Sequence, residues 1–124
     1  QLLIEENAKK LGVSPIKIIE SDIKEFLNND FNNSFSNSNR VLIGGCDKET
    51  KIEIIEALSR FLKEGDIIVI PIITYEVLQK VSNCLRQLNY ETSMNLIQTF
   101  KGVSISEGTR FEPNNPVFII KAKK

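Results

Sequence analysis

Three short segments combine residues able to bind a ligand with a position directly after an apolar run. They are Ser21-Asp22, Gly44-Gly45-Cys46 and Pro71-Ile72-Ile73. If each apolar run is a strand of an open α/β sheet, these segments lie beyond the carboxyl ends of the strands, where such sheets bind ligands. A carboxylate there can accept a hydrogen bond from a ligand amine, and glycine lets a ligand approach the main chain closely.

Asp22 has two interpretations, and the sequence leaves both open. Its carboxylate can cap a helix that begins at the next residue. Alternatively, the carboxylate accepts from a ligand amine, such as the exocyclic amine of adenine, while the following backbone N–H donates to a ring nitrogen. Gly44 and Gly45 likewise either permit a tight turn or admit a ligand. Cys46 has no base in the sequence suited to activate it, so we do not expect a nucleophile there.

A late segment, residues 101–117, reads KGVSISEGTRFEPNNPV and is the most unusual part of the chain. Its glycines, prolines and polar residues predict a long hairpin loop between the last two strands. Lys101 and Arg110 could instead pair with substrate carboxylates, Arg110 in bidentate fashion. Asn115-Pro116 could simply fix the start of the last strand.

Composition excludes several kinds of chemistry. The 124 residues include no histidine, which removes Ser-His-Asp and Cys-His catalysis and imidazole metal ligands. The two cysteines, Cys46 and Cys84, lack CxxC spacing, so we expect no disulfide, no metal site and a cytoplasmic protein. Sixteen basic residues balance sixteen acidic ones, which gives no electrostatic reason to bind nucleic acid or a membrane. No GxGxxG loop follows any predicted strand.

The elements that must position these residues follow from periodicity and turn signals. The predicted helices are residues 1–12 with Gly12 as the stop, 21–27, 47–65 with the cap at Asp47, and 74–88 with the cap at Thr74. The predicted strands are Ile16–Ile19, Arg40–Ile43, Asp66–Ile70, Glu91–Thr99 and Val117–Ala122. Ile52, Ile55, Leu58 and Leu62 are the expected core stripe of the third helix. Residues 28–39, almost all Asn and Ser, predict a flexible loop.

This order predicts one domain with an open α/β sheet, parallel except for an antiparallel edge formed by the last two strands. Asp66–Ile70 is apolar on both faces and is expected in the middle of the sheet. The first helix has no capping residue before it. We therefore expect that Gln1 lies inside a longer natural chain, and that the missing first strands leave an exposed sheet edge through which the protein self-associates.

Four motifs together resemble the decarboxylating precorrin-6Y methyltransferases of cobalamin biosynthesis. They are V-x-P-I-K-I-I-E-x-D, R-V-L-I-G-G, F-L-K-E-G-D-I-I-V-I and, most specifically, G-V-S-I-x-x-G-T-R-F-x-P-x-N-P-V-F-I-I. The resemblance covers residues 2–122. It implies a Rossmann-like methyltransferase sheet, mostly parallel with an antiparallel final strand pair, of which this chain lacks the first strands and the glycine-rich loop.

The resemblance also implies the ligands and their residues. S-adenosylmethionine would be the methyl donor and a precorrin tetrapyrrole the substrate. Asp22 would face the cofactor adenine, with Ile23 supplying a backbone contact and Ser21 standing where relatives usually have glycine. Gly44 and Gly45 would line the methionine end of the cofactor.

Lys101, Arg110 and Asn115 would lie near the tetrapyrrole, in a region that the family also uses for subunit contacts, so a homo-oligomer is expected. The catalytic residues stay unassigned. Two other hypotheses remain open: a non-catalytic interaction module, and another Rossmann-like nucleotide-binding enzyme.

Overall fold

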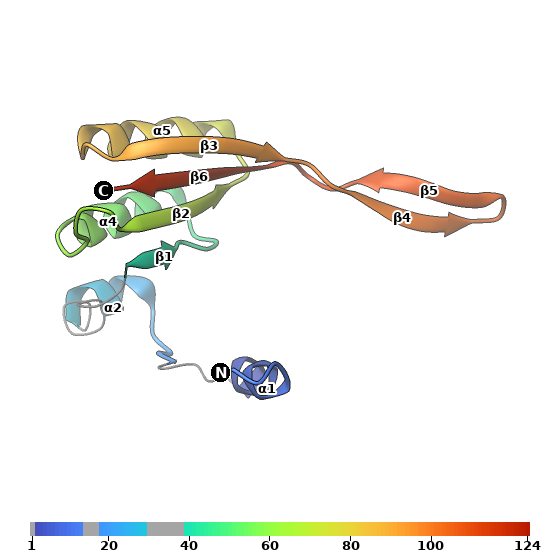
Figure 1. The fold of residues 1–124 in the computed structure, drawn as a ribbon, viewed down its shortest axis with the longest axis horizontal. Coiled ribbons are helices and arrows are strands. Elements are labelled where there is room, and N and C mark those ends of the chain that lie inside the picture. Colours follow the sequence, from blue (N-terminus) through green and yellow to red (C-terminus); the bar gives the residue numbers. More distant parts are fainter. Residues whose placement is uncertain (1, 14–17, 30–38) are drawn as a thin grey trace. The chain divides into compact units, whose positions relative to one another are not determined.

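The computed structural model describes residues 2–13, 18–29 and 39–124, and it divides into two compact units (Figure 1). The smaller unit is Gln1–Phe31 and the larger is Asn32–Lys124. The expected loop at residues 28–39 lies mostly outside the described residues. Its first two residues belong to a helix.

The smaller unit contains two helices, α1 (Leu2–Lys10) and α2 (Ile23–Asn29). Gly12 ends α1 as predicted: its φ is +68°, its N–H donates to Lys9, and the N–H of Val13 reaches back to Ala8 at 2.9 Å. This bond pattern closes many helices and needs a left-handed residue. The predicted strand at Ile16–Ile19 is not confirmed, because residues 18–20 have no strand structure and residues 14–17 are not described.

The larger unit is built on a four-stranded sheet in the order β1-β2-β6-β3. Its strands are β1 (Arg40–Leu42), β2 (Ile67–Ile72), β3 (Glu91–Ile97) and β6 (Val117–Lys123). β1 pairs with β2 in parallel, and β6 is antiparallel to both of its neighbours. The α/β class and the antiparallel final pair are confirmed. The antiparallel strand, however, lies inside the sheet and not at its edge.

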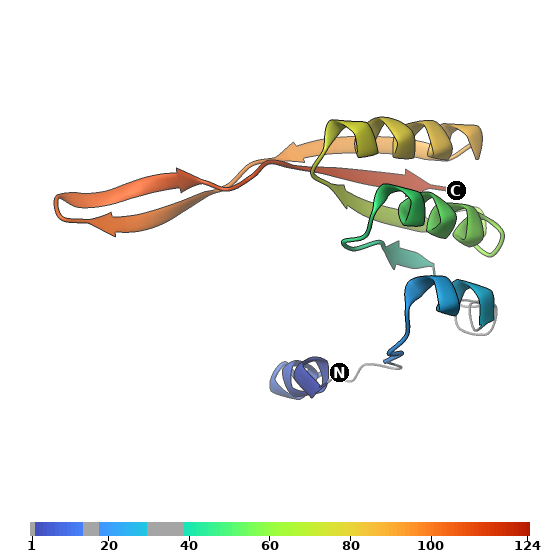
Figure 2. The same ribbon diagram turned by 180° about the vertical axis from the view of Figure 1, so that it is seen from behind.

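Two helices cover one face of this sheet, α4 (Lys48–Ser59) and α5 (Tyr75–Gln87). Both lie on the same side of the four strands (Figures 1 and 2). Alternate residues of β2 are buried against them because side chains of a strand alternate between faces. The core consists of branched apolar side chains with at most 1% of their surface exposed: Ile55, Leu58, Ile68, Ile70, Val81, Leu85 and Ile120.

The predicted core stripe of α4 needs one correction. Ile55, Leu58 and Leu62 are buried as expected, but Ile52 is only half-buried and Ile54 takes its place in the core. α4 also ends at Ser59, six residues before Gly65. Gly65 has φ of +90° and donates its N–H to the carbonyl of Lys124, so it shapes the turn into β2 and does not end the helix.

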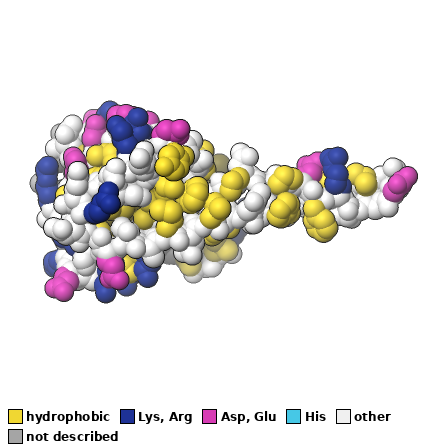
Figure 3. Space-filling view, turned by 90° about the horizontal axis from the view of Figure 1, so that it is seen from above, with side chains coloured by type: hydrophobic (Ala, Val, Ile, Leu, Met, Phe, Trp, Pro, Cys, Tyr) yellow, Lys and Arg dark blue, Asp and Glu magenta, His cyan; other side chains and the backbone are white. Residues whose placement is uncertain are grey.

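Residues 100–113 form a two-stranded ribbon and not the predicted loop. β4 (Phe100–Ile105) and β5 (Gly108–Pro113) pair antiparallel, and the ribbon projects beyond the end of β3 and β6 (Figures 1 and 3). Gly108, with φ of +145°, follows the turn at the tip. Asn114 ties the base to Thr99, through its N–H at 2.8 Å and its side-chain amide at 2.9 Å.

Among the described residues of the larger unit, no helix covers the second face of the sheet. Leu42 at the outer strand has 70% of its surface exposed, and Ile67, Val69 and Pro71 of β2 are only half-buried. β1 pairs only with β2 among the described strands, as expected for a sheet edge. No described helix has the length and apolar character needed to cross a membrane.

Candidate functional site

The best-defined candidate site is the loop Gly44–Cys46, which connects the carboxyl end of β1 to α4. Asp47 closes the loop as the helix cap: its carboxylate accepts from the N–H of Thr50 at 2.9 Å and from the Thr50 hydroxyl at 2.6 Å. Thr50 is buried, whereas Asp47 is exposed, so these two hydrogen bonds lie at the boundary between the core and the surface. The predicted cap at Asp47 is confirmed, and it fixes where the loop stops.

Lys51 is buried beneath this loop, with 4% of its surface exposed. Its Nζ donates to the carbonyl oxygens of Gly44 at 3.1 Å and of Cys46 at 2.8 Å, and lies 3.5 Å from Cys46 Sγ. The sequence reasoning missed this residue. Its spacing of four and seven residues from Ile55 and Leu58 places it on the buried face of α4, and that signal could have identified it.

The main-chain conformation at positions 44 and 45 does not itself require glycine. Gly12, Gly65 and Gly108 have positive φ, whereas Gly44 and Gly45 do not. A Cβ atom added to either one would meet nothing within 4 Å. The tight-turn interpretation therefore gains no support from the backbone. The loop has open space beside its main chain, as close approach of a ligand requires.

Asp22 acts as a helix cap in this structure. Its Oδ1 accepts from the N–H of Lys24 at 2.8 Å, at the start of α2, and Ser21 Oγ donates to the Asp22 carbonyl. Asp22 is exposed and Ile23, the first helical residue, is half-buried. Both lie in the smaller unit, whereas Gly44 and Gly45 belong to the larger one.

The ribbon carries two of the three predicted substrate residues on one face. Lys101 lies opposite Glu112 in the β4–β5 ladder, and Arg110 is two residues from Glu112 on the same strand. The Arg110 guanidinium already forms a hydrogen-bonded ion pair with Glu112. Asn115 is exposed in the link to β6, where its neighbour Asn114 makes the bonds to Thr99.

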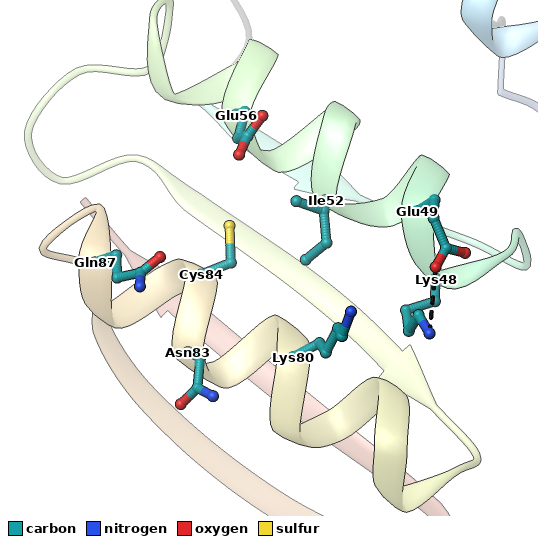
Figure 4. A pocket seen from close by; sticks show the side chains of 8 residues that line it. All are labelled: Lys48, Glu49, Ile52, Glu56, Lys80, Asn83, Cys84 and Gln87. Atoms are coloured by element: carbon teal, nitrogen blue, oxygen red, sulfur yellow. Dashed lines mark ion pairs between the residues drawn. The ribbon is translucent and has the colours of Figure 1, made fainter.

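A groove of about 450 Å³ lies between α4 and α5 (Figure 4). Its lining includes Ile52, Cys84 and Glu56. Burial raises the pKa of the Cys84 thiol, and the Glu56 carboxylate raises it further. Glu49 and Lys48 also line the groove, and the pKa of Glu49 is lowered by a backbone hydrogen bond and by Lys48, 3.2 Å away. These groups do not suggest a nucleophile, and the described residues contain no cluster able to hold a metal ion.

Comparison with known proteins gives a consistent result. No family model matches the chain. Two curated relatives, from Sulfurisphaera tokodaii and Sulfolobus acidocaldarius, are each named a probable cobalt-precorrin-6B C(15)-methyltransferase (decarboxylating) and are 30% identical over 122 residues. The match covers 98% of this chain and 60% of each relative, so the chain spans about three-fifths of their length.

Solved structures agree. The precorrin-6Y C5,15-methyltransferase from Geobacter metallireducens has a TM-score of 0.78 and 29% identity, with 98% of this chain and 61% of that chain covered. A precorrin 8W decarboxylase from Methanobacterium thermoautotrophicum has a TM-score of 0.79 at 24% identity, with 97% and 62% covered. A SAM-dependent O-methyltransferase from Thermotoga maritima, at 16% identity and a TM-score of 0.65, shares the fold, with 98% and 45% covered.

The sheet, its covering helices and these likenesses define the class. The chain has the Rossmann-like α/β fold of a methyltransferase and corresponds to its C-terminal part. Within that class, the two curated relatives that match nearly the whole chain at 30% identity are named as decarboxylating precorrin methyltransferases. Their names agree with the family inferred from the sequence motifs.

Proposed function

We propose that this chain is part of an enzyme that methylates and decarboxylates a precorrin tetrapyrrole in the cytoplasm, with S-adenosylmethionine as the methyl donor. The names of the relatives and of the Geobacter metallireducens structure support the reaction. The chain covers only part of their length, and the residues it lacks by comparison would complete the cofactor site.

The proposal is supported above all by the backbone conformation of Gly44 and Gly45 and by the open space beside them. Both follow a strand at the carboxyl edge, neither needs positive φ, and the space beside each is open. A bound ligand against the main chain would explain why side chains are absent there. We assign the methionine end of the cofactor to this loop.

The adenine is assigned to Asp22 and Ile23. In the structure one oxygen of the Asp22 carboxylate caps α2, which fixes the orientation of the group and leaves its second oxygen outside that bond. That oxygen can accept from the exocyclic amine while the main chain at Ile23 contacts the ring. The helix cap and the adenine contact are then compatible roles of one side chain.

When bound, S-adenosylmethionine supplies a methyl group already activated by its sulfonium. The precorrin carbon is itself an enamine-like nucleophile, so the protein has mainly to align the two groups and exclude water. No strong base is needed for methyl transfer, which agrees with a sequence without histidine.

Lys101, Arg110 and Asn115 are assigned to the tetrapyrrole. The two cations would hold the substrate's other carboxylates and so help the loss of carbon dioxide from the ring acetate. Arg110 would first have to exchange Glu112 for a substrate carboxylate, and since both side chains are largely exposed this exchange is inexpensive.

We also propose that the enzyme is a homo-oligomer that associates through the ribbon. Phe111, Phe100 and Ile105 have 71%, 60% and 48% of their surface exposed. Apolar side chains on both strands of a projecting ribbon are unusual for a surface that stays in water (Figure 3).

Calorimetric titration with S-adenosylmethionine tests the proposal. We expect binding to a chain extended at its N-terminus to the full length of the relatives, and weak or no binding to residues 1–124. Binding to neither chain would refute the proposal and favour an interaction module. Preference for a nicotinamide cofactor would favour a different Rossmann-like enzyme.

A further inference from the structure

We propose that Lys51 is a positioning residue, which holds the loop Gly44–Cys46 in the shape that receives the cofactor. This inference rests on the proposed function, because that function assigns the loop to S-adenosylmethionine. The relatives' names and the sequence motifs say nothing of Lys51. The proposal comes from its burial and its hydrogen bonds alone.

The position of the Lys51 ammonium is unfavourable in itself. Burying a charged group costs free energy unless its hydrogen bonds are replaced. Lys51 also lies four residues after the cap Asp47, near the positive end of the α4 dipole, which repels a cation. A compensating interaction must therefore hold it there, and the carbonyl oxygens of Gly44 and Cys46 provide one.

Packing does not require a lysine at this position. Ile54, Ile55 and Leu58 of the same helix fill the core with apolar side chains. A methionine would occupy the place of the Lys51 stem without the desolvation cost, and buried charged groups can often be replaced by apolar ones without loss of stability. What only lysine supplies is the set of donors directed at the loop.

Those donors act on the peptide groups on either side of the pair Gly45-Cys46. Two adjacent glycines give a loop wide conformational freedom, which a ligand would have to restrict on binding. Lys51 fixes the direction of the Gly44 carbonyl and of the Cys46 carbonyl, and Asp47 anchors the next residues to Thr50. The loop is thereby ordered before the ligand arrives.

The test compares Lys51→Met with Lys48→Met. The second is a matched control on the same helix, because Lys48 is partly exposed and pairs with Glu49 at the surface. Both variants keep an unbranched side chain. Amide relaxation and hydrogen exchange of Gly44, Gly45 and Cys46 are measured by NMR on residues 1–124, and S-adenosylmethionine affinity is measured by calorimetry on the chain extended to the relatives' length.

We expect Lys51→Met to loosen the three loop amides while the amides of β2 and β6 keep their protection, and to weaken cofactor binding about tenfold, equivalent to about 1.4 kcal/mol. Lys48→Met should change neither. If Lys51 contributed only to stability, its replacement would instead lower the hydrogen-exchange protection of amides throughout the sheet, with no separate effect on the loop. That result, or unchanged loop amides in a folded variant, overturns the proposal.

The failure of this inference differs from failure of the proposed function. If the unmodified extended chain binds no S-adenosylmethionine, the assignment of the loop to the cofactor is wrong, together with the role of Lys51 toward it. If the unmodified chain binds and Lys51→Met binds equally well, the cofactor assignment stands and only the positioning role is refuted.

Discussion

Replacing Gly44 or Gly45 by alanine should raise the stability of the fold and lower the affinity for the cofactor. Neither glycine has positive φ, and an added Cβ has no atom within 4 Å. Alanine at a conformationally compatible position restricts the unfolded chain, and such replacements stabilise proteins by about 0.4–1 kcal/mol. For a domain of this size we expect the melting temperature to rise by roughly 2–4 °C.

Cofactor affinity should fall in the same variants, because the methyl group would fill the space assigned to the ligand. Calorimetry on the extended chain measures the affinity, and urea denaturation measures the free energy of unfolding. Gly65→Ala is the matched control: φ of +90° makes it destabilising by about 1–2 kcal/mol with no direct effect on the loop.

A different outcome would refute the reasoning. If Gly44→Ala and Gly45→Ala lower the free energy of unfolding by more than about 1 kcal/mol, the glycines serve the turn itself, and the argument for a ligand beside them fails. If they stabilise the protein and leave affinity unchanged, the loop is not part of the cofactor site.

Further predictions concern the substrate residues, the tyrosine of the core and the thiol of the groove. Arg110→Ala in the extended enzyme should lower kcat/KM for the tetrapyrrole about tenfold, about 1.4 kcal/mol, without changing cofactor affinity, and unchanged kinetics would remove Arg110 from the site. Tyr90 Oη is buried without a hydrogen-bond partner among the described residues, so Tyr90→Phe should leave urea stability unchanged or raise it by up to about 1 kcal/mol; a loss above that value would indicate a partner for the hydroxyl. Burial and the Glu56 charge raise the pKa of the Cys84 thiol and so disfavour its thiolate. In a Cys46→Ser variant, the rate of alkylation of Cys84 should therefore rise only above the pH at which a free thiol ionises. Glu56→Gln should move that midpoint to lower pH, and a midpoint that does not move would exclude the carboxylate as a cause.

The order of elements in the larger unit could be predicted because each has a strong local signal. Asp47 caps α4, and the apolar run of β2 is central in the sheet, as its composition required. The place of β6 could not be predicted. Residue patterns indicate that two strands are antiparallel, but they do not show that the later strand is inserted beside β2.

The ribbon at residues 100–113 was mistaken for a loop for a physical reason. Glycine, proline and polar residues are turn signals, yet Gly102 lies inside a strand where a cross-strand neighbour, Thr109, leaves only 3.2 Å for an added Cβ. In the candidate site, Gly44 and Gly45 could be predicted because they directly follow a strand. Lys51 was missed because a lysine at a core position contradicts the usual rule for burial.

The insertion of β6 between β2 and β3 makes assembly of the sheet depend on synthesis order. β3 and the ribbon are synthesised before Val117–Lys123, yet among the described strands of the sheet β3 pairs only with β6. Until β6 joins the sheet, β3 and β2 therefore each have an open hydrogen-bonding edge. A nascent or truncated chain without those seven residues would be a target for chaperones and proteases.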